Sequence, residues 1–228
     1  DIRVTKTGSP KYEAMAGLDS QDSDWYAEST DRWNGTVQDA AHGITSLTAP
    51  NVGTTAPNGY YNNNAQIVIQ DNDIYRRNGS GTLQKLTENV DYPAGTVTTT
   101  STSFYNNREG QYIRMTTIDM AKLAGTTGSC TPGPCANNLP SNGLLYATRT
   151  DATGGDEPGI KLTNGAEVAS PSGSGGLTVV SNQPVYIKGD YNTTNEKPAA
   201  VIADSVNLLS NNWSDANSAL GLSSRPAT

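Results

Sequence analysis

The fold depends on the stretch Leu177-Thr-Val-Val-Ser-Asn-Gln-Pro-Val-Tyr-Ile187, which places two short aliphatic runs a few residues apart. Similar runs recur along the second half of the chain, at 144–148, 160–162, 177–180, 185–187, 199–202 and 206–209. The connectors between them are Asn142-Gly143, Asn164-Gly165, Gly175-Gly176, Ser181-Asn182 and Gly189-Asp190. Glycine and asparagine accept the positive φ angles of tight corners. The pattern predicts a mainly β chain whose C-terminal half is a parallel β-helix or solenoid, with a β-sandwich as the alternative.

Upstream of this half, residues 1–64 are mixed and rich in turn formers, and the segment 49–64, which ends in Tyr60-Tyr-Asn-Asn-Asn64, predicts an exposed loop. We expect an irregular, loop-rich N-terminal region over 1–64, packed on a β-rich domain of residues 65–228 that is truncated at its C-terminal end. The first residue is Asp1 and no signal peptide precedes it, so we expect a processed or trimmed N-terminus.

Two local patterns lie between the N-terminal region and the strand-rich second half of the chain. Asn78-Gly79 lies between two alternating segments and predicts a β-hairpin. After an alternating strand at 111–115, Thr116 or Thr117 is expected to cap the single short α-helix of the fold, through residues 118–123. Such a short helix is stable only when its apolar side chains pack onto a sheet.

Composition excludes some classes of function. The 228 residues carry a formal net charge of −7, whereas a nucleic-acid binder needs a surface of Lys and Arg for the backbone phosphates. No run of residues approaches the roughly 20 apolar residues of a membrane span. We therefore expect neither nucleic acid nor a membrane span among the interactions of this chain.

Catalytic signatures are also missing from the sequence. His42 is the only histidine, so any Ser-His-Asp triad would need it, and neither a Gly-x-Ser-x-Gly elbow nor a phosphate-binding loop occurs. With 22 acidic residues, a pair of carboxylates has no weight until a distance is known. We expect no enzymatic activity and assign no catalytic residue.

The two cysteines, Cys130 and Cys135, flank the turn-forming segment Thr-Pro-Gly-Pro. This spacing predicts a local disulfide formed in an oxidising compartment, with a reduced pair as the alternative. Zinc is not expected, because a single histidine cannot complete a Cys/His ligand set.

Two groups of residues are candidates for ligand binding. Exposed aromatic rings beside amides and carboxylates suit the faces and hydroxyls of sugars, which suggests a glycan site; the alternative is that the tryptophans anchor small cores. These aromatic candidates are Trp25, Tyr26, Trp33, Tyr60 and Tyr61. Carboxylates that could bind Ca²⁺ lie at Asp19, Asp22 and Asp24 and at Asp71 and Asp73, but a solvated acidic face is the favoured explanation, and no cofactor or metal site is assigned.

Four segments resemble, in the same order, the PilX-type surface proteins that are associated with pilus assembly in type IV pilus-like systems. They are Asn107-Arg-Glu-Gly-Gln-Tyr-Ile-Arg-Met-Thr-Thr-Ile-Asp-Met-Ala-Lys-Leu123, Asn142-Gly-Leu-Leu-Tyr146, the segment from Gly176 to Asn192, and the segment from Lys197 to Trp213. Residues 65–70 resemble the strand before this block. The chain departs from the family in lacking the hydrophobic N-terminal helix and in ending at Thr228, where similar proteins continue.

The resemblance implies a bacterial protein that is exported to the cell surface or to a filament, and it implies no catalytic residue. We expect a non-enzymatic extracellular structural subunit or adhesin, whose partners are other filament subunits or a second chain that completes the β-fold. A polysaccharide-binding module is the alternative, and a secreted carbohydrate-active enzyme is the third. The first interpretation predicts an apolar or unpaired-strand surface at the C-terminal end of the fold.

Overall fold

The computed structural model describes residues 3–5, 12–14, 51–99, 104–152, 155–168 and 175–225. The chain divides into two units, Asp1–Pro50 and Asn51–Thr228. In the first unit, β1 (Arg3–Thr5) pairs antiparallel with β2 (Tyr12–Ala14). Residues 51–64, which we grouped with the N-terminal region, fall in the second unit.

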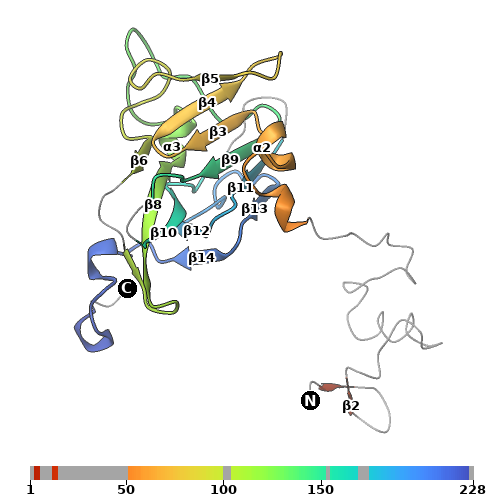
Figure 1. The fold of residues 1–228 in the computed structure, drawn as a ribbon, viewed down its shortest axis with the longest axis vertical. Coiled ribbons are helices and arrows are strands. Elements are labelled where there is room, and N and C mark those ends of the chain that lie inside the picture. Colours follow the sequence, from red (N-terminus) through yellow and green to blue (C-terminus); the bar gives the residue numbers. More distant parts are fainter. Residues whose placement is uncertain are drawn as a thin grey trace, which may run out of the picture. The chain divides into compact units, whose positions relative to one another are not determined.

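The second unit is mainly β, as predicted, and its described residues form two sheets of six strands each. One sheet contains four parallel strands, β8 (Gln111–Asp119), β10 (Glu157–Thr163), β12 (Val185–Lys188) and β14 (Val206–Leu209). The other contains four more, β3 (Ile67–Gln70), β9 (Leu144–Thr148), β11 (Leu177–Val180) and β13 (Ala199–Ile202). From β8 to β14 the chain alternates between the two sheets (Figure 1). Each strand therefore pairs with the strand two positions along the chain.

The parallel register aligns aliphatic side chains into rows between the sheets. Ile118, Leu162, Ile187 and Leu208 are successive partners across β8, β10, β12 and β14. The first three are buried in the main core. Burying one such side chain contributes roughly 1.5–3 kcal/mol, so the rows supply much of the stabilisation of this unit.

Antiparallel strands complete the sheets at the ends opposite to β13 and β14. In one sheet β4 (Asp73–Arg77) pairs with β3, and β5 (Leu83–Lys85) pairs with β4. In the other, β6 (Val97–Thr99) and β7 (Phe104–Asn106) both pair antiparallel with β8. The β4–β5 hairpin confirms the Asn78-Gly79 prediction, and the side chain of Asn78 accepts hydrogen bonds from the backbone N–H groups of Ser80 and Thr82.

The predicted helix is shorter than expected and begins later. Residues up to Asp119 belong to β8, because the β-branched Thr116, Thr117 and Ile118 pair in register with β10. The helix α3 is Met120–Leu123, and the carboxylate of Asp119 caps it by accepting a hydrogen bond from the backbone N–H of Lys122 at 3.0 Å.

A second short helix replaces the predicted exposed loop, so the expectation of a single helix is wrong. The helix α2 is Tyr60–Asn64. Its asparagines hydrogen-bond to nearby carbonyls, from Asn63 Nδ2 to Asn58 O at 2.7 Å and from Asn64 Nδ2 to Tyr60 O at 2.8 Å. Three short 3₁₀ turns complete the described elements, η3 (Val52–Thr54), η4 (Asp215–Asn217) and η5 (Leu222–Ser224).

The disulfide prediction is confirmed. The sulfurs of Cys130 and Cys135 are 2.07 Å apart, and their Cα atoms are 5.0 Å apart. The bond closes a short turn within the loop between α3 and β9, and Thr131 N–H in that turn donates to the carbonyl of Asn89 at 2.9 Å. The disulfide therefore stabilises a loop that contacts residues 86–96, the connection between β5 and β6.

Close stacking of β11 on β13 gives a first testable prediction. A Cβ atom at Gly176 would lie 2.4 Å from the carbonyl oxygen of Pro198, which leads into β13. We expect Gly176→Ala to lower the free energy of unfolding by about 1–3 kcal/mol, measured by urea denaturation, because the backbone of β13 would have to shift. The control is Gly79→Ala, where an added Cβ meets nothing within 4 Å and the change should stay within about 0.5 kcal/mol. Equal stability of the two variants would contradict the stacking.

Candidate functional site

The first candidate site is the last rung, which we define as β13 and β14 together. Both strands stand at the end of their sheets, with a neighbour on one edge only among the described residues. Their sequences, Ala-Ala-Val-Ile and Val-Asn-Leu-Leu, contain no charged residue. Natural proteins commonly protect such edges with charges, prolines or bulges, and neither of these two strands contains a charge or a proline.

The orientation of the backbone follows from the hydrogen bonds to the preceding rung. The carbonyls of Ser205 and Leu209 accept from β12 and its connectors at 2.8 and 2.9 Å. Because successive peptide groups alternate in direction along a strand, the N–H and C=O groups of Val206 and Leu208 point to the open edge. The open edge of β14 thus presents backbone N–H donors and C=O acceptors with which another strand can form hydrogen bonds.

The side chains on the same two residues are exposed although they belong to buried rows. Leu208 is 80% exposed and Val206 is 47% exposed. Their register partners on β12, Ile187 and Val185, are 6% and 0% exposed. The rows of the core therefore continue into the last rung without a cover among the described residues.

The second candidate is the aromatic–arginine groove, a cavity of about 260 Å³ beside β14 on the outer face of its sheet. Phe104, Tyr105, Asn106, Asn107, Arg108, Tyr186, Asn207, Leu208, Leu209, Trp213 and Arg225 line it. Phe104 forms its floor, with ring centroids 4.8 Å from Tyr186 and 5.6 Å from Trp213 in edge-to-face geometry. Burial raises the pKa of Tyr186 to about 12, and its hydroxyl accepts a hydrogen bond from Asn106 Nδ2 at 3.3 Å. That tyrosine therefore stays neutral at physiological pH.

The C-terminal segment is held in place along this groove by a chain of polar contacts. Asp215 forms an ion pair with the nearly buried Lys161 of β10 and accepts from Trp213 Nε1 at 2.8 Å. The buried Ser218 accepts at its hydroxyl from the backbone N–H of Tyr105 at 2.8 Å, and at its carbonyl from Asn107 Nδ2 at 2.9 Å. These contacts fix Trp213 over β7 and β14.

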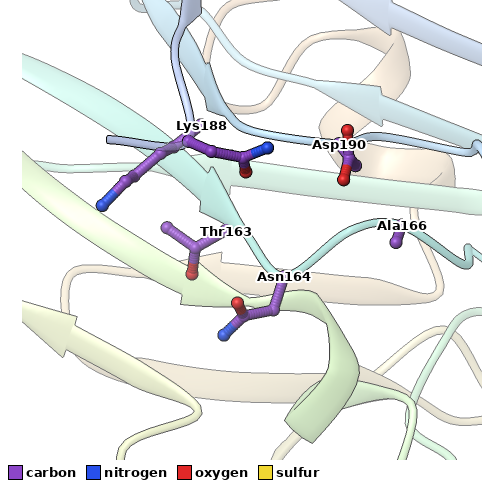
Figure 2. Close-up of a pocket in the computed structure, with 6 residues that line it drawn as sticks. Thr163, Asn164, Ala166, Lys188 and Asp190 are labelled. Carbon is purple, nitrogen blue, oxygen red and sulfur yellow. The ribbon is translucent and has the colours of Figure 1, made fainter. Parts of the chain in front are cut away.

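The third candidate is the corner pocket, a cavity of about 440 Å³ where β10, β12 and β14 end. Its lining residues are Thr163, Asn164, Ala166, Lys188, Asp190 and Asn211, and Figure 2 shows the labelled side chains coming from the ends of β10 and β12. Asn164 Nδ2 donates to Asp119 Oδ2 at 2.8 Å, which fixes one wall. Among the described lining residues Asp190 is the one carboxylate. Two amides, one hydroxyl and one charge of each sign suit a polyhydroxylated ligand.

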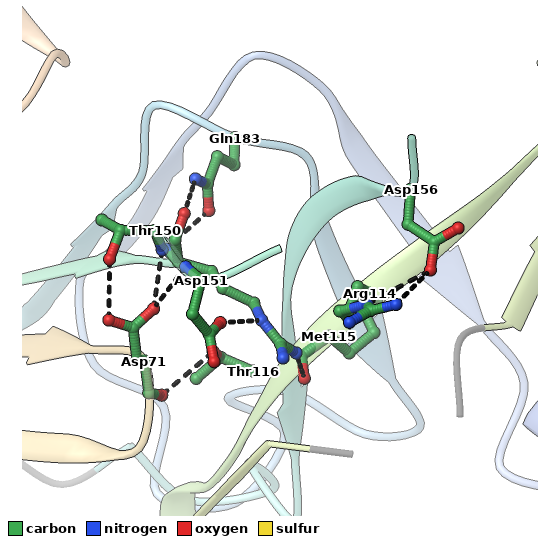
Figure 3. Close-up of polar contacts among 9 residues, drawn as sticks. Asp71, Arg114, Met115, Thr116, Thr150, Asp151, Asp156 and Gln183 are labelled. Atoms are coloured by element: carbon green, nitrogen blue, oxygen red, sulfur yellow. Dashed lines mark hydrogen bonds and ion pairs between the residues drawn. The ribbon is translucent and has the colours of Figure 1, made fainter. Parts of the chain in front are cut away.

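The candidate calcium ligands have other partners. The carboxylate of Asp71 accepts from the backbone N–H and the hydroxyl of Thr150, at 2.6 and 2.8 Å, and from Asp151 N–H at 3.2 Å (Figure 3). Asp73 instead pairs with Lys85 at 2.7 Å. No cluster of three or more metal-ligating side chains occurs in the described part of the chain. Asp19, Asp22 and Asp24 lie outside the described residues.

Asp71 belongs to a polar network that joins the two sheets. Arg149, with its side chain 4% exposed, forms an ion pair with Asp151 at 2.7 Å and donates to the carbonyl of Met115 on β8. The side-chain amide of Gln183 accepts from Arg149 N–H at 2.8 Å and donates to the Arg149 carbonyl. Figure 3 shows these contacts meeting where β9 ends. The network satisfies a buried guanidinium, so its role is structural.

Of the predicted aromatic site residues, the structure describes only Tyr60 and Tyr61. Their rings are in contact, with centroids 5.4 Å apart, and Tyr60 is 64% exposed. Tyr61 packs against the cluster of Val68 and Tyr146 on the outer face of the other sheet, so it serves that small core. Trp25, Tyr26 and Trp33 lie outside the described residues, and the proposed glycan role of all five residues stays a prediction.

The aromatic–arginine groove was not predicted from the sequence. Its residues come from β7, the turn between β7 and β8, β12, β14 and the C-terminal segment, so no local motif marks it. Trp213, placed just after the last strand in a chain with 3 tryptophans, was the one available signal.

No protein-family model, curated protein or solved structure matches this chain. Within the described ranges, no helix is both long enough and apolar enough to cross a membrane.

The environment of Asp71 gives the second prediction. Partial burial alone would raise its pKa, but the hydrogen bonds from Thr150 and Asp151 outweigh this and hold the pKa below the ordinary 3.8. The ionised carboxylate therefore stabilises the fold above pH ~4, and this contribution is lost as the pH falls through the lowered pKa. We expect Asp71→Asn to be less stable than the wild type at pH 7 in urea denaturation, and the difference to shrink below pH ~4. A difference that stays constant from pH 7 to 3 would contradict this role.

Proposed function

We propose that the chain is a non-enzymatic extracellular subunit or adhesin of a filament of the type IV pilus-like class, and that copies join through the last rung. The observation that carries this proposal is the uncovered row end at Leu208, which is 80% exposed although its row is otherwise buried. The disulfide between Cys130 and Cys135 supports an oxidising location such as the bacterial cell surface. The resemblance to PilX-type surface proteins points the same way.

The alternation of parallel strands supports a short β-solenoid as the architecture of this subunit. In a solenoid each coil covers the apolar face of its neighbour, so the final coil requires a cap or a partner. The last rung has four residues in each of its two strands and no charge in either. A second copy is the occupant that these features favour, because antiparallel pairing of β14 with β14 across a two-fold axis uses one self-complementary patch.

Such pairing would bring Val206 of each copy opposite Leu208 of the other when the axis passes through Asn207. The outward N–H and C=O groups of both residues would then be paired, and their side chains would join two open cores. This pairing would remove the open edge of β14 in each copy from solvent.

A polar alternative is a polysaccharide-binding module, and the corner pocket favours it. Its two amides and one hydroxyl match sugar hydroxyls, and its volume of about 440 Å³ lies within the range of small-molecule sites. Sugar binding in this pocket is compatible with an adhesin that also self-associates, since the pocket lies at strand ends and not at the open edge of β14.

The copy-to-copy contact gives the third prediction. In sedimentation velocity, the wild type should form dimers as its concentration rises through the micromolar range, whereas Val206→Lys/Leu208→Lys should stay monomeric because two charges from each copy would be buried at the contact. The control is Leu83→Lys, on the edge strand β5 at the other end of the same stack and 37% exposed, which should dimerise like the wild type. A wild type that remains monomeric at millimolar concentration, or a double variant that dimerises equally, would contradict the proposal.

A further inference from the structure

The aromatic–arginine groove includes Asn207, Leu208 and Leu209 of the last rung but shares no lining residue with the corner pocket, and its chemistry points to a ligand of its own. It combines three kinds of group: aromatic rings of Tyr105, Tyr186 and Trp213, side-chain amides of Asn106, Asn107 and Asn207, and the guanidinium groups of Arg108 and Arg225. We propose that this groove binds an acidic saccharide, with a sugar ring against the aromatic side chains and its carboxylate at the two arginines.

The groove carries positive charge in an acidic protein. The whole chain carries a net charge of −7, yet this groove is lined by two arginines and by no carboxylate among its described lining residues. Neither Arg108 nor Arg225 forms an ion pair within the described part of the chain, where Lys85, Arg114, Arg149 and Lys161 each do. Two cations in a concave site of an acidic protein select for an anion, and a guanidinium binds a carboxylate with two parallel hydrogen bonds.

The guanidinium of Arg225 is held in a fixed position. Its Nε donates to the carbonyl of Leu220 at 2.9 Å, and its Nη2 donates to the carbonyl of Ser218 at 2.8 Å. Arg108 is exposed on the turn between β7 and β8, where its backbone N–H donates to Asn106 Oδ1 at 3.1 Å. One arginine is thus preorganised and the other is free to close on a ligand.

The aromatic part of the groove is also rigid. Phe104 is 2% exposed and holds Tyr186 and Trp213 in edge-to-face contacts, while Tyr105 is in ring contact with Tyr112 at 5.0 Å. Ring faces beside amides provide the stacking surface and the hydroxyl partners that a pyranose needs. The volume of about 260 Å³ is smaller than that of a typical drug-sized site, which favours one sugar unit of a chain inside it.

The test is isothermal titration calorimetry of the whole chain with trigalacturonate, galactotriose, triglutamate and inorganic phosphate. We expect trigalacturonate to bind at least about tenfold more tightly than the other three, since only it presents both a sugar ring and a carboxylate. Affinity should fall as salt is raised from 50 to 300 mM, because the contact at the arginines is ionic. Equal binding of galactotriose would overturn the acidic specificity, and equal binding of triglutamate or phosphate would show a general anion site and overturn the saccharide.

Variants separate this groove from other surfaces. Arg108→Gln should weaken trigalacturonate binding about tenfold, and the matched change Lys197→Gln, at an exposed cation outside the groove, should leave it unchanged. Tyr105→Ala should weaken trigalacturonate too, with its fold checked by an unchanged thermal midpoint. Unaltered affinity of Arg108→Gln, or absence of trigalacturonate binding at millimolar concentration, would overturn the proposal. Because Leu208 also lines the groove, the double variant Val206→Lys/Leu208→Lys is used only to measure self-association and not in these titrations.

Discussion

The structure depends on aliphatic side chains that are aligned in rows by parallel, in-register pairing. Ile118, Leu162 and Ile187 cover one another because each occupies the same position on consecutive strands of one sheet. A parallel neighbour cannot be reached through a tight hairpin, so the chain crosses to the other sheet between every two of these strands. A second set of rows forms there, with Leu145 and Val179 as partners, and the two sets meet in one core. Short aliphatic runs are sufficient for such a core, which explains how a chain with one phenylalanine and a large share of polar residues folds.

The two ends of the stack are unequal. At one end the antiparallel strands β4, β5, β6 and β7 complete the sheets, and charged groups such as Lys85 occupy the edge. At the other end the rows reach Val206 and Leu208 and stop. The features that we connect with function lie at or beside this second end: the open edge, the aromatic–arginine groove and the corner pocket all include residues of β14 or of the segment that follows it. The same stacking that builds the core thus places the candidate sites together.

The sequence was sufficient to predict the six short strands of the second half, because each is an apolar run bounded by residues that favour turns. It was misleading where two local preferences compete. Thr116 and Thr117 are reasonable helix caps, but β-branched residues that pair with a neighbouring strand extend β8 to Asp119 instead. At Tyr60–Asn64 the asparagines suggested a loop, yet their side chains stabilise a helical turn. The groove could not have been predicted, since Arg225 and Tyr105 meet only after the segment of Trp213 and Ser218 folds back on β7.

The central claim is that the last rung presents an open strand edge, and hydrogen exchange of individual backbone amides tests it most directly. The account predicts alternation along β14 in the monomer: the amides of Asn207 and Leu209, which face β12, exchange slowly, and those of Val206 and Leu208 exchange at rates close to those of an unfolded peptide. The same two amides should become protected when the concentration is raised. Uniform protection along β14 in the dilute protein would show that the edge is already covered and would contradict the account.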